Sequence, residues 1–120
     1  MPLLGFGTFK MRGYELLYEA INAALASGYR SFDTVSVYKN EEDIGKALKV
    51  LLPKYNLTRQ DIFVTSKLGP SEQGKEKAKA AILGSLSRLG FEYLDLYLIH
   101  WPANYKINIL TLNRIMPYSI

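Results

Sequence analysis

The sequence predicts an α/β protein in which short parallel strands alternate with helices. Three observations predict this class. Strand-like and helix-like segments follow one another in the order β-α-β-α-β-α-β, each helical segment stops at a glycine or a proline, and the last strand is apolar almost throughout. Strands that alternate with helices pair in parallel through right-handed crossovers, and parallel strands are usually buried. With 48% hydrophobic residues, 120 residues suffice for one domain with a core.

The amino-terminal part of the chain supplies two strands and the helix between them. Residues 3–9 form a strand with two glycines, a residue that in strands often marks close approach by a ligand or a neighbouring chain. The helix is expected over 14–27, where apolar residues recur every three or four positions. Gly28 ends this helix and leads directly into a second strand at 31–34.

The same pattern then continues to residue 100. A helix spans about 41–52, with Pro53 just past its end, and a β-branched, apolar strand covers 61–67. A third helix at 75–89 is followed by the apolar strand 93–100. A flavodoxin-like sheet and part of a (β/α)8 barrel both fit this periodicity, which does not choose between them.

The character of the chain changes near its end. Residues 1–102 carry all the predicted strands and helices and form one unit. Residues 103–120 have weak amphipathic spacing and no capping box, so we expect a divergent tail with at most one or two loose helical turns.

Composition excludes several classes of function. The net charge of +4 is spread along the chain, and its one dense basic run lies on a helix face, so no nucleic-acid partner is expected. There is no cysteine and one histidine, which gives no basis for a disulfide framework or a metal site. No apolar run is long enough to span a membrane, and no signal peptide is apparent. The cytoplasm is the expected location.

Four residues with reactive side chains recur at the spacing of one βα unit. Asp33 ends the second strand, Lys67 the third and His100 the fourth, at intervals of 34 and 33 residues. Tyr38 lies in the loop after Asp33. Because parallel strands point the same way, we expect all four side chains at the carboxyl end of the sheet, where active sites of barrels lie.

Such a cluster suits proton donation to a carbonyl oxygen. The Lys67 ammonium favours the phenolate form of Tyr38 and is expected to lower the pKa of its hydroxyl, while Asp33 keeps the lysine charged. His100 can donate a hydrogen bond to the carbonyl oxygen. No side chain supplies a hydride, so the cluster requires a cofactor such as a nicotinamide.

Each of these residues also has a structural explanation when taken alone. Asp33 can cap a turn or form a plain ion pair with Lys67. Tyr38 can be surface packing, His100 a hydrogen-bonded histidine at a strand end, and Trp101 a packing residue or a pocket wall. The coincidence of the residues on one rim favours the functional interpretation.

The chain resembles the aldo-keto reductases, NAD(P)H-dependent reductases built on a (β/α)8 barrel. The resemblance runs from about residue 2 to 102 and is strongest in GYRSFDT at 28–34, followed by Glu41 and the Ile-Gly pair that ends at Gly45. LGFGT near the amino terminus, TSK at the third strand and DLYLIHWP at the fourth also match. Val35 departs from this signature, which usually has a smaller residue there.

The resemblance implies a role for each matching position. Tyr38 would donate the proton, Lys67 would lower its pKa, and Asp33 would hold Lys67 and touch the cofactor. The remaining positions are implied as contacts of NADPH (or NADH) and of a small carbonyl substrate: Gly7, Thr8, Phe9 and Asp33 beside the cofactor, and His100 and Trp101 beside the substrate. Many members have tryptophan at the position of Phe9, so substrate preference stays open.

A complete barrel needs eight βα units and about 250 residues, whereas this chain supplies four strands and three helices. We therefore expect the amino-terminal half of an aldo-keto reductase, weakly active or inactive by itself in reducing aldehydes or ketones. One alternative is a non-catalytic half-barrel that self-associates or binds another subunit through its exposed sheet edges. Another is a flavodoxin-like domain that binds FMN.

Overall fold

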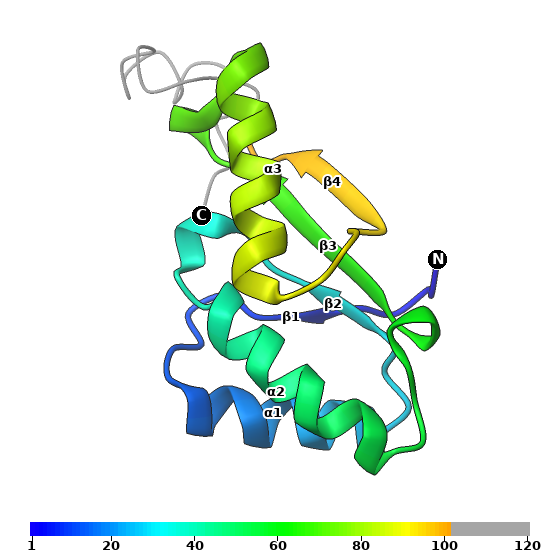
Figure 1. Cartoon of the computed structure of the whole chain (residues 1–120). Helices are drawn as coiled ribbons and strands as arrows, with labels where there is room; N and C mark the ends of the chain where they lie inside the picture. Colours follow the sequence, from blue (N-terminus) through cyan, green and yellow to red (C-terminus); the bar gives the residue numbers. More distant parts are fainter. Residues whose placement is uncertain (102–120) are drawn as a thin grey trace.

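The computed structural model describes residues 1–101, so the predicted tail at 103–120 lies outside the described residues. Four parallel strands form one sheet in the sequential order β1-β2-β3-β4, and helices cover one of its faces (Figure 1). A flavodoxin-like sheet has the order 2-1-3-4-5, because its connections reverse direction at a switch point. The sequential order excludes that alternative and is that of a partial (β/α)8 barrel.

The elements follow the predicted alternation. The strands are β1 (Phe6–Gly7), β2 (Ser31–Asp33), β3 (Phe63–Leu68) and β4 (Leu96–Ile99). The helices are α1 (Tyr14–Ala26), α2 (Glu41–Lys54) and α3 (Lys75–Leu89), with short 3₁₀ turns η1 (Ser36–Tyr38), η2 (Arg59–Asp61) and η3 (Pro70–Glu72). The first and last strands are shorter than predicted, because each pairs with a neighbour along one side only in the described part of the chain.

The predicted end of the second helix is wrong by two residues. Pro53 lies inside α2, which continues to Lys54. Pro53 lacks an N–H to donate, but it lies one residue before the end of α2, so little of the helix follows it. The N–H of Tyr55 closes this helix end by donating to the carbonyl oxygens of Leu51 and Leu52, at 3.2 and 3.1 Å.

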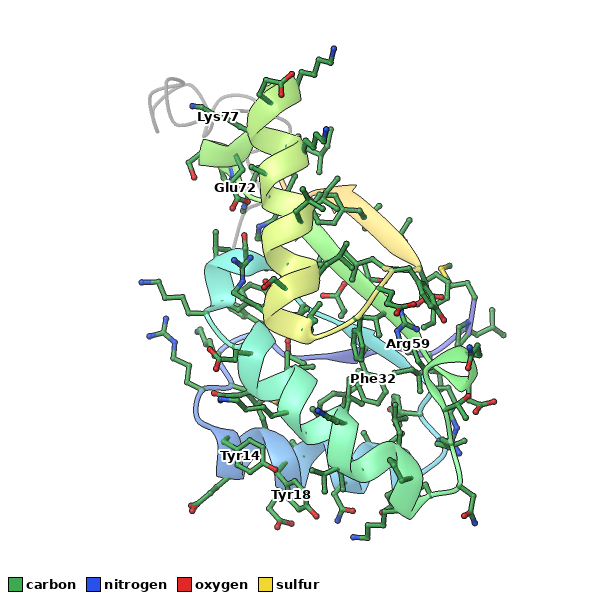
Figure 2. The ribbon with its side chains drawn as sticks, in the orientation of Figure 1. Tyr14, Tyr18, Phe32, Arg59, Glu72 and Lys77 are labelled. Atoms are coloured by element: carbon green, nitrogen blue, oxygen red, sulfur yellow. The ribbon has the colours of Figure 1, made fainter. Side chains whose placement is uncertain are left out.

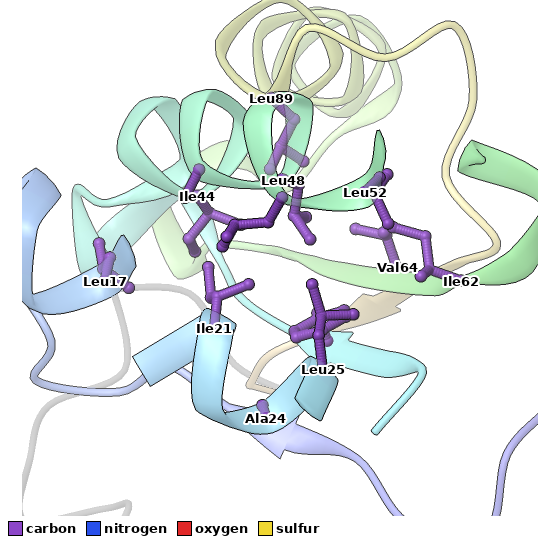
Figure 3. Packing of buried hydrophobic residues seen from close by; sticks show 13 residues of the cluster. Leu17, Ile21, Ala24, Leu25, Ile44, Leu48, Leu52, Ile62, Val64 and Leu89 are labelled. Carbon is purple, nitrogen blue, oxygen red and sulfur yellow. The ribbon is translucent and has the colours of Figure 1, made fainter. Parts of the chain in front are cut away.

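The core lies between the sheet and the helices (Figure 3). Side chains from α1 and α2 meet those of β2 and β3, in agreement with the apolar spacing of both helices. Its fully buried members include Leu17, Ile21, Phe32, Leu48 and Val64. Because Phe32 and Val64 face the helices, alternation along the strands turns their neighbours Asp33 and Lys67 to the opposite face.

Gly45 allows a close contact between α2 and α3. A Cβ atom at this position would lie 2.2 Å from the carbonyl oxygen of Leu89, at the end of α3. Only glycine therefore allows α2 and α3 to approach this closely. This contact holds the start of α2, and with it the loop after β2, against the end of α3.

The fourth strand is less buried than its apolar sequence predicts. Leu98 is 42% exposed and Ile99 66% exposed. Within residues 1–101, β4 has a paired strand on the β3 side only, so its other edge is uncovered. None of the helices described here is long and apolar enough to cross a membrane.

Candidate active site

Four side chains from successive βα units meet at the carboxyl end of the sheet. Asp33 is the last residue of β2, Lys67 lies one residue before the end of β3, and His100 directly follows β4. Tyr38 ends η1, in the connection between β2 and α2. The structure thus brings the four predicted residues to one rim, which we call the carboxyl rim.

An ion pair stands at the centre of this rim. The Lys67 ammonium donates to the Asp33 carboxylate and, at 3.2 Å, to the carbonyl oxygen of Thr34. The Lys67 side chain is 13% exposed, whereas that of Asp33 is 39% exposed. Burial of an ammonium requires such a partner. The exposed part of the Asp33 carboxylate remains accessible to a ligand.

Three groups surround the ring of Tyr38. The Phe9 ring lies 5.0 Å away between centroids, and the His100 ring lies 6.0 Å away, edge-on at 83°. The Lys67 ammonium is 5.7 Å from the centroid of the Tyr38 ring. Tilted and edge-to-face pairs and a nearby cation are favourable contacts for an aromatic ring. These contacts hold Tyr38 beside the ion pair.

The pKa of Tyr38 shifts in the direction opposite to the one expected from the sequence. Burial raises the pKa of the Tyr38 hydroxyl, and the negative charge of Asp33 raises it further. The expected lowering by Lys67 does not appear, which we attribute to the ion pair between its ammonium and Asp33. The phenol is therefore fully protonated at neutral pH.

His100 is held as a neutral imidazole. Burial lowers the pKa of His100, the Lys67 charge lowers it further, and Asp33 partly opposes both effects. Its backbone N–H donates to the carbonyl oxygen of Leu68 at 3.1 Å, which fixes the residue at the end of β4. The Nδ1 atom is buried and has no hydrogen-bond partner among the described residues. An unpaired buried polar atom of this kind is rare in folded proteins and often marks a functional site.

The three predicted cofactor positions after β1 differ from one another. Gly7 pairs with Asp33 in the sheet register, and a Cβ atom built on it meets nothing within 4 Å. Phe9 is 62% exposed. Thr8 is fully buried, and its hydroxyl and N–H both donate to the Asp33 carbonyl oxygen, at 2.9 and 3.1 Å. Thr8 thus supports the backbone of Asp33 from the interior, whereas Gly7 and Phe9 are accessible at the carboxyl rim.

Trp101 extends the rim beyond His100. Its ring lies 5.8 Å from that of His100 and is tilted by 58°, and the residue is 37% exposed. Its carbonyl oxygen accepts a hydrogen bond from the Gln73 side chain at 2.9 Å. This position agrees with either a pocket wall or a packing residue. Within residues 1–101 no three metal-ligating side chains gather as a metal ion requires.

The sequence did not predict the burial of two polar residues that follow Tyr38 in the chain. Asn40 and Glu41 are each only 1% exposed. An asparagine and a glutamate at the start of a helix are typical of an exposed cap and first turn, so their burial has no signal in the pattern. Glu41 accepts hydrogen bonds from Ser66 at 2.7 Å and from Arg88 at 2.8 Å, and thereby ties the start of α2 to β3 and α3.

Comparison with known proteins gives one consistent result. The Aldo/keto reductase family model matches residues 3–113. Glyoxal reductase of Bacillus subtilis (strain 168) is 44% identical over 106 residues, which are 88% of this chain and 37% of that protein. The aldose reductase structure from Schistosoma japonicum superposes with a TM-score of 0.80 at 43% identity, over 85% of this chain and 34% of that one.

A third match is a structure with its cofactor. The Bombyx mori aldo-keto reductase in complex with NADP has a TM-score of 0.79 at 32% identity, over 87% of this chain and 36% of that one. The chain thus spans little more than a third of the length of these three proteins.

Proposed function

Because the chain belongs to the aldo/keto reductase family, we propose that it carries the proton-donating part of a reductase that converts aldehydes or ketones to alcohols. One observation carries this proposal: the Asp33–Lys67 ion pair lies beside Tyr38 and His100 at the carboxyl rim. This is the end of a parallel barrel sheet at which catalytic residues lie.

The side chains of the rim suit transfer of a proton to a carbonyl oxygen. Tyr38, protonated at neutral pH, gives up its hydroxyl proton as negative charge develops on that oxygen. The Lys67 ammonium stabilises the phenolate that remains, and Asp33 holds the ammonium in place. His100 orients the carbonyl by a hydrogen bond from its imidazole. A bound NADPH, or NADH, supplies the hydride.

The residues present fit the nicotinamide end of such a cofactor. The backbone of Gly7 has open space in front of it and pairs with Asp33, whose carboxylate is partly exposed, so a flat ring could lie against both. Gly7, Phe9 and Asp33 would hold this end, with Thr8 supporting them from below.

The proposed substrate is a small carbonyl compound. The exposed rings of Phe9 and Trp101 offer apolar walls on either side of the Tyr38–His100 pair. The relative from Bacillus subtilis is named for glyoxal, a small dialdehyde. The cytoplasm, where NADPH is abundant, is the proposed setting.

The test uses two proteins. The first is the 120-residue chain, which we expect to turn over little NADPH by itself. The second, the chimeric reductase, carries residues 1–101 in place of the matching segment of Bacillus subtilis glyoxal reductase. We expect the chimeric reductase to oxidise NADPH when glyoxal is added, as followed by NADPH absorbance.

In the chimeric reductase, Tyr38→Phe is the test variant and Tyr93→Phe is its matched control. Removing the Tyr38 hydroxyl should lower the rate by about 10²- to 10⁴-fold, the usual contribution of a general acid. Tyr93 lies before β4, at the other end of that strand, so Tyr93→Phe should leave the rate unchanged. Equal rates for the parent protein and Tyr38→Phe would contradict the proposal.

A second candidate function rests on the exposed strand β4. With Leu98 and Ile99 exposed, the edge and both faces of this strand offer a surface for pairing with another chain. In this alternative the chain is a non-catalytic interaction module that self-associates. Light scattering distinguishes the two: a monomer at all accessible concentrations would exclude self-association.

A further inference from the structure

The buried side chain of Asn40 forms hydrogen bonds with both segments that precede it at the carboxyl rim. Its Nδ2 donates to the carbonyl oxygens of Thr8 at 2.9 Å and Met11 at 3.0 Å, in the loop after β1. Its Oδ1 accepts a hydrogen bond from the Thr34 hydroxyl at 3.0 Å, in the loop after β2. Both N–H groups and the oxygen of the carboxamide are thus engaged, and none of these bonds caps the helix that Asn40 precedes.

The two segments joined by Asn40 carry the other parts of the rim. Thr34 donates to Asn40 through its hydroxyl and accepts from the Lys67 ammonium through its carbonyl oxygen. Thr8 is followed directly by Phe9, whose ring packs on Tyr38. The Asn40 side chain therefore links the loop that contacts Lys67 to the loop that carries Phe9.

The backbone directs Tyr38 and Asn40 to opposite sides. Lys39, between them, has a left-handed conformation with φ of 56°, unusual for a residue other than glycine. This turn leaves Tyr38 at the rim and places the Asn40 side chain in the interior. A strained residue of this kind persists only where the surrounding contacts fix it.

We propose that Asn40 is a positioning residue, whose carboxamide fixes the Tyr38 ring relative to Phe9, Lys67 and His100 through Thr8, Met11 and Thr34. The assignment of Tyr38 as proton donor rests on the proposed function, whereas the placement of its ring does not. A carboxamide suits the position, because the site requires two donors and one acceptor.

The experiment uses the only histidine of the chain as a probe. The His100 ring lies edge-on to Tyr38 at 6.0 Å and tilted against Trp101 at 5.8 Å, so the ring currents of both shift its ring-proton resonances in proton NMR spectra. The change in these resonances on Tyr38→Leu substitution gives the contribution of Tyr38. Asn40→Ala and Thr34→Val in the 120-residue chain should move these resonances toward their values in the urea-unfolded chain. Thr34→Ser retains the hydroxyl and should restore the parent position.

Two controls separate positioning from general loss of stability. Asp95→Asn weakens a contact at the opposite end of β4, and it should lower the free energy of unfolding while leaving the His100 resonances in place. Circular dichroism establishes that each variant is folded. If Asn40→Ala does not fold, the His100 resonances of Thr34→Val and Thr34→Ser are compared instead, and a difference between them supports the proposal.

The proposal is overturned if a folded Asn40→Ala, or in its place Thr34→Val, leaves the His100 resonances at the parent positions. It is also overturned if Asp95→Asn moves the resonances equally. The proposed function fails separately, through an inactive chimeric reductase, and that failure leaves the NMR result unaffected. In an active chimeric reductase, Asn40→Ala should lower kcat by about 10²-fold, the cost of misplacing a reacting group by about 1 Å, with a smaller change in KM.

Discussion

The two ends of the sheet carry similar groups that are arranged for different purposes. At the carboxyl rim, Lys67 pairs with Asp33 beside the ring of Tyr38. At the opposite end, Arg59 pairs with Asp95 at 2.6 Å and lies 4.8 and 4.1 Å from the ring centroids of Phe91 and Tyr93 (Figure 2 labels Arg59). Each end thus has one ion pair with aromatic rings close to it.

The difference lies in what each pair leaves available. Arg59 also donates to the carbonyl oxygens of Ile62 and Tyr93, both at 3.0 Å, and Asp95 accepts from the Val64 N–H at 2.8 Å. These bonds tie the amino ends of β3 and β4 together. At the carboxyl rim the Asp33 carboxylate remains partly exposed. An ion pair with accessible polar groups is therefore the better guide to function, whereas one enclosed by backbone contacts stabilises the fold.

The same substitution at both ends gives the largest expected contrast. In the chimeric reductase, Lys67→Met removes the charge that stabilises the Tyr38 phenolate and should lower the rate of NADPH oxidation by at least about 10²-fold. Arg59→Met, its matched control, should leave the rate of the folded protein unchanged. A rate that survives Lys67→Met would show that the two ends do not differ in function.

Stability should show the reverse order for these two variants. Arg59→Met loses three charge-assisted hydrogen bonds and should lower the free energy of unfolding by about 2–3 kcal/mol. Lys67→Met should lower it by only about 1 kcal/mol, because Asp33 is partly hydrated without its partner. Urea unfolding followed by the fluorescence of Trp101, the single tryptophan, measures both. Equal losses of unfolding free energy in the two variants would contradict the inference that the Arg59–Asp95 ion pair mainly stabilises the fold.

Gly7→Ala tests whether the open space at the rim belongs to a ligand. An added Cβ meets nothing within 4 Å, so the free energy of unfolding should change by less than about 0.5 kcal/mol. In the chimeric reductase the same methyl group should weaken NADPH binding, measured by quenching of protein fluorescence. Unchanged affinity would place the cofactor elsewhere.

The pH dependence of stability is the smallest expected effect. Because burial and Lys67 hold the pKa of His100 below its ordinary 6.5, the unfolded chain takes up a proton before the folded one does. The stabilisation from neutral His100 is therefore complete above pH 6.5 and is lost as the pH falls through the folded pKa. Lys67→Met should raise the pKa of His100 in an NMR titration. An unchanged pKa would contradict the effect of the Lys67 charge on His100.

Parts of this site were predictable from the sequence because they depend on period and direction alone. Asp33, Lys67 and His100 recur at the length of one βα unit, and parallel strands bring such residues to one end of the sheet whatever their packing. The choice between a flavodoxin-like sheet and a partial barrel needed the strand order, which local patterns do not contain.

The structure alone decided the features that depend on surroundings. The raised pKa of Tyr38 follows from burial and from the engagement of Lys67 by Asp33, and the exposure of β4 follows from pairing on one side. Burial of Asn40 depends on two loops, those after β1 and β2, that meet only in the folded chain. The sequence by itself determined which residues reach the carboxyl rim, since chain direction and spacing are local. Only the tertiary structure decided their charge, exposure and orientation, because these depend on neighbours far away in the chain.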